Sequence, residues 1–268
     1  MEITKNELKY LASLSLKKVR RSERKFLLEG WRALREAESS SARIEYVAVV
    51  PEQLDARNHR PLIEALRKKK IPIKEISSRD LQKVGDTFHA QGVVALIHQR
   101  NSSIDDIRID GSVFVVALDG ISDPGNLGSL IRTADWFGAR AVLLGEGCVE
   151  LHNEKVVRST AGSLFHLPII ENVSLTGVSA TLKGMGFSIA SLSADGSRTI
   201  EEVEFAEKQL LVFGSEAHGI KEQIRSISDH VLRIPKFGNA ESLNVVVACG
   251  IVLAHARLTG LPPSGKGE

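Results

Sequence analysis

The chain has 268 residues, of which 43% are hydrophobic, and its 35 lysines and arginines nearly balance 33 acidic residues, giving a formal net charge of +2. This length allows two modest domains with cores of their own. The longest uncharged apolar stretch, residues 242–254, is shorter than the roughly 18–20 residues that a membrane crossing needs, and the polar N-terminus does not resemble a secretory signal. We therefore expect a cytoplasmic protein without a membrane span.

Positive charge is concentrated near the N-terminus. Residues 1–30 contain eight lysines and arginines against four acidic residues, whereas the rest of the chain contains 27 against 29. Such a cluster can neutralise phosphates of a nucleic acid, but it can equally be the solvated face of a helix. The candidate RNA-binding residues are Lys17, Lys18, Arg20, Arg21, Arg24 and Lys25.

Cysteine and histidine usage argues against a metal site. Cys148 and Cys249 lie among apolar residues, and the eight histidines are scattered along the chain. Neither residue type occurs at the spacing of a zinc site, and two isolated cysteines do not form a disulfide framework. We expect both cysteines to be packing residues and no metal to be bound.

Residues 1–100 alternate between helical and strand-like patterns. After an amphipathic start come a strand at 45–50, a helix at 61–70, a strand at 71–77, a short helix at 78–84 and a strand at 92–97. This order predicts a small α/β domain. Residues 101–112 are polar and rich in turn formers, so we interpret them as a linker to a second domain at 113–268.

The second domain begins a series of apolar, β-rich runs separated by helical segments. Continuous apolar runs indicate strands buried on both faces, as in a mostly parallel sheet with helices on both sides. The last helix, at 241–257, is apolar nearly all round, which indicates burial or a subunit interface. The predicted strands are 113–119, 141–145, 187–193, 209–214 and 230–235, and the other helices are 126–137, 153–165 and 177–185.

Three loops that follow predicted strands contain glycines, which allow a backbone to approach a ligand closely. Ligands of open parallel sheets bind in such loops. The sequence has no phosphate-binding loop, dinucleotide fingerprint, esterase elbow or zinc-protease motif. The loops must therefore serve another chemistry.

The three loops read DPGNLGSLIRTA at 123–134, LVFGSEAHGI at 211–220 and IPKFGNAESLNV at 234–245. In this order they resemble the SPOUT class of RNA methyltransferases, and within it the SpoU/TrmH group of ribose 2′-O-methyltransferases. The resemblance implies a deep trefoil knot, a homodimer and S-adenosylmethionine as the cofactor. The segments RKFLLEG at 24–30 and QGVVA at 91–95 are similar to an L30e-like substrate-binding domain, which makes RNA the expected partner of the basic N-terminal residues.

The resemblance also implies roles for individual residues. Asn126 would hold the loop or the ribose, and Arg132 would stabilise negative charge, since a guanidinium is always protonated and cannot act as a base. Alternative readings are a surface arginine for Arg158, a backbone-capping contact for Glu216 and a structural role for Asn244. The implied catalytic residues are Asn126, Arg132, Arg158 and Glu216, and the implied cofactor-binding residues are Gly214, Glu216, Ile234, Ser242, Leu243 and Asn244.

The expected activity is methylation of a ribose 2′-hydroxyl in RNA, with ribosomal RNA favoured and transfer RNA as the alternative substrate. A homologue that binds RNA or ribosomes without catalysis stays open. So do a methyltransferase for a base nitrogen and one for a small molecule. Methyl transfer to RNA, the position of the new methyl group and the salt dependence of binding separate these possibilities.

Overall fold

The computed structural model describes residues 2–54, 56–84, 91–215 and 218–259. The chain divides into two compact units, the first made of residues 1–100 and 150–166 and the second of residues 101–149 and 167–268. No helix among the described residues is long and apolar enough to span a membrane.

The first unit is built on a four-stranded sheet with the order β1-β4-β2-β3. Strand β4 pairs antiparallel with both β1 and β2, and β2 pairs parallel with β3. Its elements are α1 (Lys5–Ser13), α2 (Lys17–Glu23), β1 (Lys25–Glu29), α3 (Trp31–Ser39), β2 (Ile44–Val49), α4 (Pro51–Leu54), α5 (Arg60–Lys68), β3 (Ile73–Glu75), α6 (Ser78–Val84), β4 (Val93–His98), α8 (Glu154–Thr160) and the 3-10 turn η2 (Ser163–Phe165).

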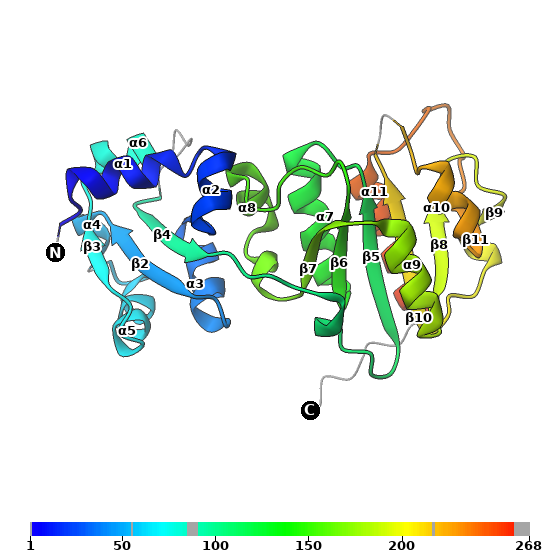
Figure 1. Ribbon diagram of the computed structural model, residues 1–268, viewed down its shortest axis with the longest axis horizontal. Coiled ribbons are helices and arrows are strands. Elements are labelled where there is room, and N and C mark those ends of the chain that lie inside the picture. Colours follow the sequence, from blue (N-terminus) through cyan, green and yellow to red (C-terminus); the bar gives the residue numbers. More distant parts are fainter. Residues whose placement is uncertain (1, 55, 85–90, 216–217, 260–268) are drawn as a thin grey trace. The chain divides into compact units, whose positions relative to one another are not determined.

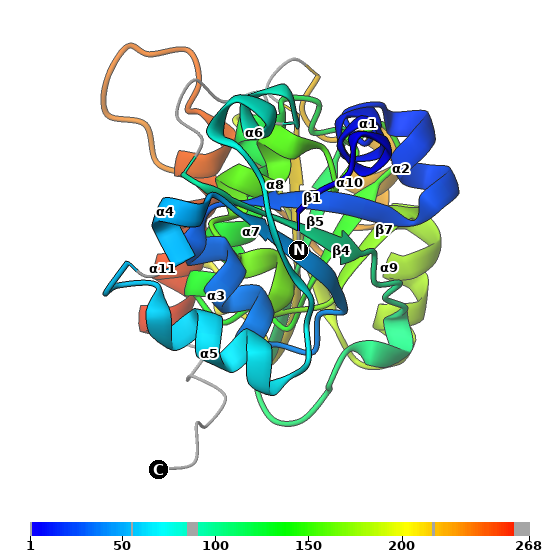
Figure 2. The same ribbon diagram turned by 90° about the vertical axis from the view of Figure 1, so that its left-hand side faces the viewer.

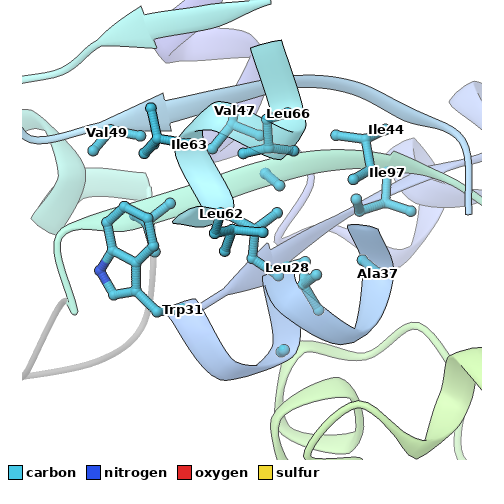
Figure 3. Close-up of a cluster of buried hydrophobic side chains, with 14 of the residues drawn as sticks. Leu28, Trp31, Ala37, Ile44, Val47, Val49, Leu62, Ile63, Leu66 and Ile97 are labelled. Atoms are coloured by element: carbon cyan, nitrogen blue, oxygen red, sulfur yellow. The ribbon is translucent and has the colours of Figure 1, made fainter. Parts of the chain in front are cut away.

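Helices cover both faces of this sheet, with α1 and α6 on one side and α3 and α5 on the other (Figure 2). The α3–α5 side holds the larger apolar cluster, in which Trp31, Leu62 and Leu66 pack against Leu28 and Val47 (Figure 3). Side chains alternate along each strand, so both faces are apolar. The predicted α/β character of residues 1–100 is therefore observed.

Strand β1 differs from the sequence-based expectation. The expected strands of this unit begin at residue 45, but Phe26 and Leu27 lie in a strand and face opposite sides of the sheet, in two different apolar clusters. Lysine, leucine and glutamate have little intrinsic preference for strands, and pairing with β4 decides the conformation. A five-residue run of this composition does not reveal that pairing.

Residues 150–166 belong to the first unit, although the sequence-based boundary assigns them to the second domain. The buried Arg20 explains this grouping: its Nε and Nη2 donate to the Glu150 carboxylate at 3.1 and 2.7 Å, and its Nη1 donates to the carbonyls of Leu14 and Ser15. The His152 ring also packs on Phe26, with ring centroids 4.7 Å apart. A contact over 130 residues of sequence leaves no local pattern.

The second unit contains a seven-stranded sheet with the order β7-β6-β5-β10-β8-β11-β9, in which all neighbouring strands run parallel (Figure 1). The predicted mostly parallel sheet is confirmed. Its elements are η1 (Ile104–Asp106), β5 (Val113–Asp119), α7 (Pro124–Trp136), β6 (Ala141–Gly145), β7 (Ile169–Val173), α9 (Leu175–Gly184), β8 (Ser188–Leu192), β9 (Arg198–Thr199), η3 (Ile200–Glu202), β10 (Lys208–Gly214), α10 (Glu222–Ile227), β11 (His230–Arg233) and α11 (Val245–Thr259).

Helices α9 and α10 cover one face of this sheet, where Val178 and Ile224 belong to the same apolar cluster as alternate residues of β5. Helix α11 lies on the opposite face: the Arg257 guanidinium stacks 4.3 Å from the centre of the Phe114 ring, and α11 packs on α7. The expected linker also contributes to this unit, since Ile107 is buried beside α9 and β5. Its few apolar residues are therefore core residues of the second unit.

His152 gives the first unit a predictable pH dependence. Burial, followed by the charges of Arg20 and Arg24, lowers the pKa of His152 to about 3. Between pH 6.5 and 3 the unfolded chain binds this proton and the folded chain does not, so acidification favours unfolding. We expect this group to reduce the free energy of unfolding by up to about 1.4 kcal/mol per pH unit below about pH 6.5.

The measurement is denaturant unfolding at several pH values between 7 and 5, for the wild type and for His152→Phe. Phenylalanine keeps an aromatic ring against Phe26 and cannot be protonated. The stability of the variant should fall less steeply with acid than that of the wild type. Parallel pH profiles for the two proteins would contradict the role of His152.

Candidate active site

The first motif, residues 123–134, forms the loop after β5 and the start of α7. Asp123 caps the helix, because its carboxylate accepts a hydrogen bond from the Asn126 N–H at 2.7 Å, and Pro124 occupies the first turn, where no N–H is needed. Leu127 and Ile131 turn one face of α7 into the core. Asn126 is half-buried at the entry of the helix and Arg132 is exposed further along it.

Asn244 joins the third motif to the first. Its Nδ2 donates to the Asn126 Oδ1 at 3.3 Å, across 118 residues of sequence. Its Oδ1 accepts from the Val246 N–H at 2.9 Å, as a helix-capping side chain does at the start of α11. Asn244 therefore has a structural contact at the start of α11 and also contacts Asn126 of the first motif. Helix α11 begins after this residue, four residues later than predicted.

The second motif, residues 211–220, runs from β10 into the loop that follows it. Strand β10 ends directly beside the end of β5, where Gly214 is in register with Asp119. A Cβ on Gly214 would lie 2.2 Å from the backbone of Gly219, and the Gly219 N–H donates to the Ser215 carbonyl at 2.8 Å. Glycine is thus needed at 214 so that the loop can fold back on its own strand. The sequence predicts that the loop glycines allow the close approach of a ligand. At Gly214 the close neighbour is instead the backbone of Gly219.

Asp119 is a site residue that the sequence reading missed. It is 2% exposed at the end of β5, and its two carboxylate oxygens accept from the Lys221 N–H and pair with the Lys221 ammonium, each at 3.0 Å. These contacts hold the far end of the second motif against the strand that precedes the first motif. A charged residue ending the apolar run VFVVALD was the available signal.

Of the other predicted catalytic residues, Arg132 is exposed on α7 and Arg158 belongs to the first unit. Glu216 lies outside the described residues. Arg158 is half-buried on α8 in the first unit, with its Nη1 3.9 Å from the Glu29 carboxylate. The structure therefore brings together Asn126 and Asn244 by direct contact, with the second motif attached to the same strand end through Asp119.

The third motif presents apolar side chains to solvent. It forms the long orange loop between β11 and α11 in Figure 2. Leu243 is 47% exposed, Ile234 is half-buried and Ser242 is exposed. Apolar side chains beside exposed backbone fit a ligand with a flat aromatic ring and polar edges, such as an adenosine. Among the described residues no group of three or more potential metal ligands occurs.

The basic N-terminal run divides into three environments. Lys17, Lys18, Arg21 and Arg24 are exposed and accessible to phosphates. Lys25 is half-buried and pairs with Glu45 at 2.5 Å. Arg20 is 3% exposed and its guanidinium is occupied by Glu150 and two carbonyls. Arg20 was predicted to bind RNA, but its position makes it a structural residue.

The two partners of the buried carboxylate should contribute unequally. Asp119→Ala removes the hydrogen bond and the ion pair and leaves the partly buried Lys221 N–H without its acceptor, so we expect a loss of about 1–3 kcal/mol in the free energy of unfolding. Lys221→Met keeps the N–H bond and removes only an ammonium on a side chain that is 56% exposed, which should cost less than about 1 kcal/mol. Denaturant unfolding of both variants checks this order, and equal losses would contradict it.

Two family profiles match the chain. The SpoU rRNA Methylase family matches residues 113–254, and the MRM3-like substrate binding domain matches residues 5–95. The first covers the seven-stranded sheet, α7 and most of α11, and the second covers the first unit up to β4. These are the two parts that the resemblance to SpoU/TrmH methyltransferases and to a substrate-binding domain predicted.

Individual relatives agree over nearly the whole chain. A 23S rRNA (guanosine(2553)-2′-O)-methyltransferase of Bacillus subtilis is 31% identical over 263 residues, which are 96% of this chain and 98% of the relative. The AdoMet-bound rRNA methyltransferase of Sinorhizobium meliloti is 26% identical, with a TM-score of 0.85 over 96% of this chain and 97% of that one.

The SpoU methyltransferase AviRb of Streptomyces viridochromogenes, 23% identical, shares the fold with a TM-score of 0.84 over 96% of this chain and all of its own. The family match and the Bacillus relative each extend over at least half of the chain. The predicted resemblance is confirmed: the chain belongs to the SpoU rRNA methylase family, a family of RNA methyltransferases.

Proposed function

We propose that the protein transfers a methyl group from S-adenosylmethionine to a ribose 2′-hydroxyl of ribosomal RNA. The observation that carries the proposal is the hydrogen bond between Asn126 and Asn244, which brings the first and third motifs of the family together at one end of the sheet. The substrate follows from the Bacillus relative, a 2′-O-methyltransferase of 23S rRNA that aligns with 96% of this chain.

S-adenosylmethionine is the expected donor, and the Sinorhizobium relative carries it in its structure. The residues that would hold it are Ile234, Ser242 and Leu243 of the third motif, with Gly214 at the end of β10. The exposed face of Leu243 supplies an apolar surface, and the loop backbone supplies hydrogen-bonding groups. When bound, the donor supplies a methyl group on a positively charged sulfur.

Arg132 and Asn126 are the proposed catalytic residues. Transfer would require the 2′-hydroxyl to release its proton to solvent, and negative charge develops on the oxygen as that proton leaves. The methyl group would then pass to this oxygen, while the sulfur would keep the electrons of the broken bond as a neutral thioether. A guanidinium at 132 favours this charge, but it cannot accept the proton because it is protonated at all accessible pH values. Asn126 would orient the ribose, with its own amide held by Asn244. Glu216 and Arg158 keep their proposed roles as further contacts to donor and substrate.

The first unit is the proposed RNA-binding part, in agreement with its match to a substrate-binding domain. Lys17, Lys18, Arg21 and Arg24 lie on or next to α2 and are exposed, so they can approach phosphates. A ribosomal RNA substrate also agrees with the predicted cytoplasmic location. Transfer RNA is the alternative substrate, and the predicted reaction requires no metal.

We also propose the trefoil knot and the homodimer that the resemblance implies. Helix α11 follows the long third-motif loop and packs on α7 and against β10, in the middle of the sheet, which is compatible with a threaded C-terminus. Its outer face exposes Val247 (50%) and Ile251 (38%). Exposed aliphatic residues along one helix suit burial against a second copy of the chain.

Methyl transfer tests the proposed activity. Wild-type protein with labelled S-adenosylmethionine should methylate large-subunit ribosomal RNA, and nucleoside analysis should locate the label on a ribose 2′-oxygen. Methylation of a base nitrogen, or labelling of transfer RNA alone, would replace the proposed acceptor. Binding of RNA without any transfer would identify a non-catalytic homologue.

Arg132→Lys tests the role of the guanidinium. Lysine keeps the charge but loses the planar set of donors, so we expect kcat to fall roughly tenfold or more while the affinity for S-adenosylmethionine stays within about twofold. Lys155→Arg, an exposed position on α8 outside this cluster, is a control that should leave kcat unchanged. A variant Arg132→Lys with normal kcat would remove Arg132 from the mechanism.

Ile251→Glu tests the dimer. A glutamate in the middle of a buried apolar interface would be an unpaired charge, so the variant should sediment as a monomer at concentrations where the wild type is a dimer. Arg67→Glu, an exposed change on α5, is the control. A wild type that is monomeric at all concentrations would refute the proposed dimer.

A further inference from the structure

A basic cleft of about 510 Å³ lies at one end of the four-stranded sheet in the first unit. Its charged and titratable lining residues come from four separate segments of the chain. They are Lys25, Arg43, Glu45, Lys69, Lys70 and His98.

Strand pairing fixes these segments at the same sheet end. Lys25, the first residue of β1, is in register with His98, the last residue of β4. The His98 N–H donates to the Arg43 carbonyl at 3.0 Å, which attaches the start of β2. The Val47 N–H donates to the Pro72 carbonyl at 2.9 Å, which attaches the turn that carries Lys69 and Lys70. Backbone hydrogen bonds of the sheet therefore hold the four segments that line the cleft.

Positive charge exceeds negative charge in the lining. The Glu45 carboxylate lies 2.5 Å from the Lys25 ammonium and 2.9 Å from the His98 ring nitrogen, so one carboxylate is shared by two groups. Lys69 pairs with Glu38 at 2.9 Å. Arg43 and Lys70 form no ion pair with any carboxylate of the described residues. Two cations thus stay available to an incoming anion.

Of the two half-buried titratable groups next to Glu45, Lys25 is charged at neutral pH and His98 is neutral. Burial by itself would lower the pKa of Lys25, but the hydrogen bond and charge of Glu45 raise it, so the ammonium stays protonated. Burial and the neighbouring Arg43 lower the pKa of His98, so its ring is neutral near pH 7. The carboxylate of Glu45 is therefore balanced by Lys25, and Arg43 and Lys70 set the net positive charge.

The backbone at Lys70 has an unusual conformation for a lysine. Its φ is +57°, in the left-handed region that glycine favours at the end of a helix. The Lys70 N–H donates to the Arg67 carbonyl and the Ile71 N–H to the Leu66 carbonyl, which closes α5 in the usual way for such an ending. A lysine with this backbone conformation is less favourable for folding than a glycine. What lysine adds at position 70 is a positive charge in the lining of the cleft.

We propose that this cleft binds the phosphodiester backbone of the RNA substrate, with Arg43 and Lys70 contacting phosphates. The inference rests on the proposed function in RNA methylation and adds Arg43 and Lys70, which come from segments outside α2, to the proposed RNA-binding residues. Its lining is polar and net positive, which suits a phosphate chain rather than an apolar ligand. Its volume is within the range of about 300–1,000 Å³ of sites that hold whole ligands, so it exceeds the needs of a single small anion.

The test is RNA binding by the double variant Arg43→Ala/Lys70→Gly as a function of salt. Glycine at 70 keeps the left-handed backbone and removes the charge, so the variant should melt at the wild-type temperature or above it. The matched control is Lys68→Ala, an exposed lysine two residues away on α5 that does not line the cleft. The probes are large-subunit ribosomal RNA and a single-stranded oligouridylate.

Each lost contact to single-stranded RNA reduces the magnitude of the negative slope of log affinity against log salt concentration by about 0.7, so the double variant should reduce it by about 1.4. If binding at about 1 M salt is unaffected, this slope change corresponds to roughly 25-fold weaker binding near 0.1 M salt. Affinity for S-adenosylmethionine should not change, and Lys68→Ala should change the slope by much less than about 0.7.

Wild-type salt dependence and affinity in the double variant would overturn the proposed cleft, even if the wild type methylates RNA. A slope loss of about 0.7 in Lys68→Ala, half of the loss in the double variant, would also overturn it, because a diffuse positive field around α5 would then explain binding. If the wild type binds RNA through the cleft but transfers no methyl group, the proposed function fails and the cleft stands. The two proposals are therefore distinguishable.

Discussion

The hydrogen bond from Asn244 to Asn126 is the contact on which the candidate site depends. Asn244 caps α11 with its carbonyl oxygen and reaches α7 with its amide nitrogen, so one side chain fixes the start of the last helix relative to the first motif. Asp119 does the same for the second motif, because its buried carboxylate holds Lys221 at the end of β5. Three loops far apart in sequence are thereby attached to one sheet edge by two polar side chains.

The candidate site lies at the carboxyl ends of parallel strands, where such sheets commonly bind ligands. There the third motif exposes the apolar side chain of Leu243. The polar residues that the structure does bury there, Asp119 above all, position loops. Arg132 is exposed on α7, six residues after Asn126.

The first unit has a separate organisation of charge. Arg20 is used inside the unit to bind residues 150–166 through Glu150, whereas Arg43 and Lys70 stand at the open end of the sheet. Basic residues of one unit thus divide into structural and accessible groups, and burial decides which is which. A count of lysines and arginines near the N-terminus does not make this distinction.

The sequence by itself determined the parallel sheet and the family. The strands β5 and β6 agree with the predicted residues 113–119 and 141–145, because a continuous run of apolar residues can be recognised in the local sequence. The motif residues at 123–134, 211–220 and 234–245 likewise needed no coordinates. The tertiary structure alone decided the strand β1, the grouping of residues 150–166 with the first unit, the burial of Arg20, and the role of Asp119. All four depend on contacts between residues distant in sequence, and such contacts leave no periodic pattern in the chain.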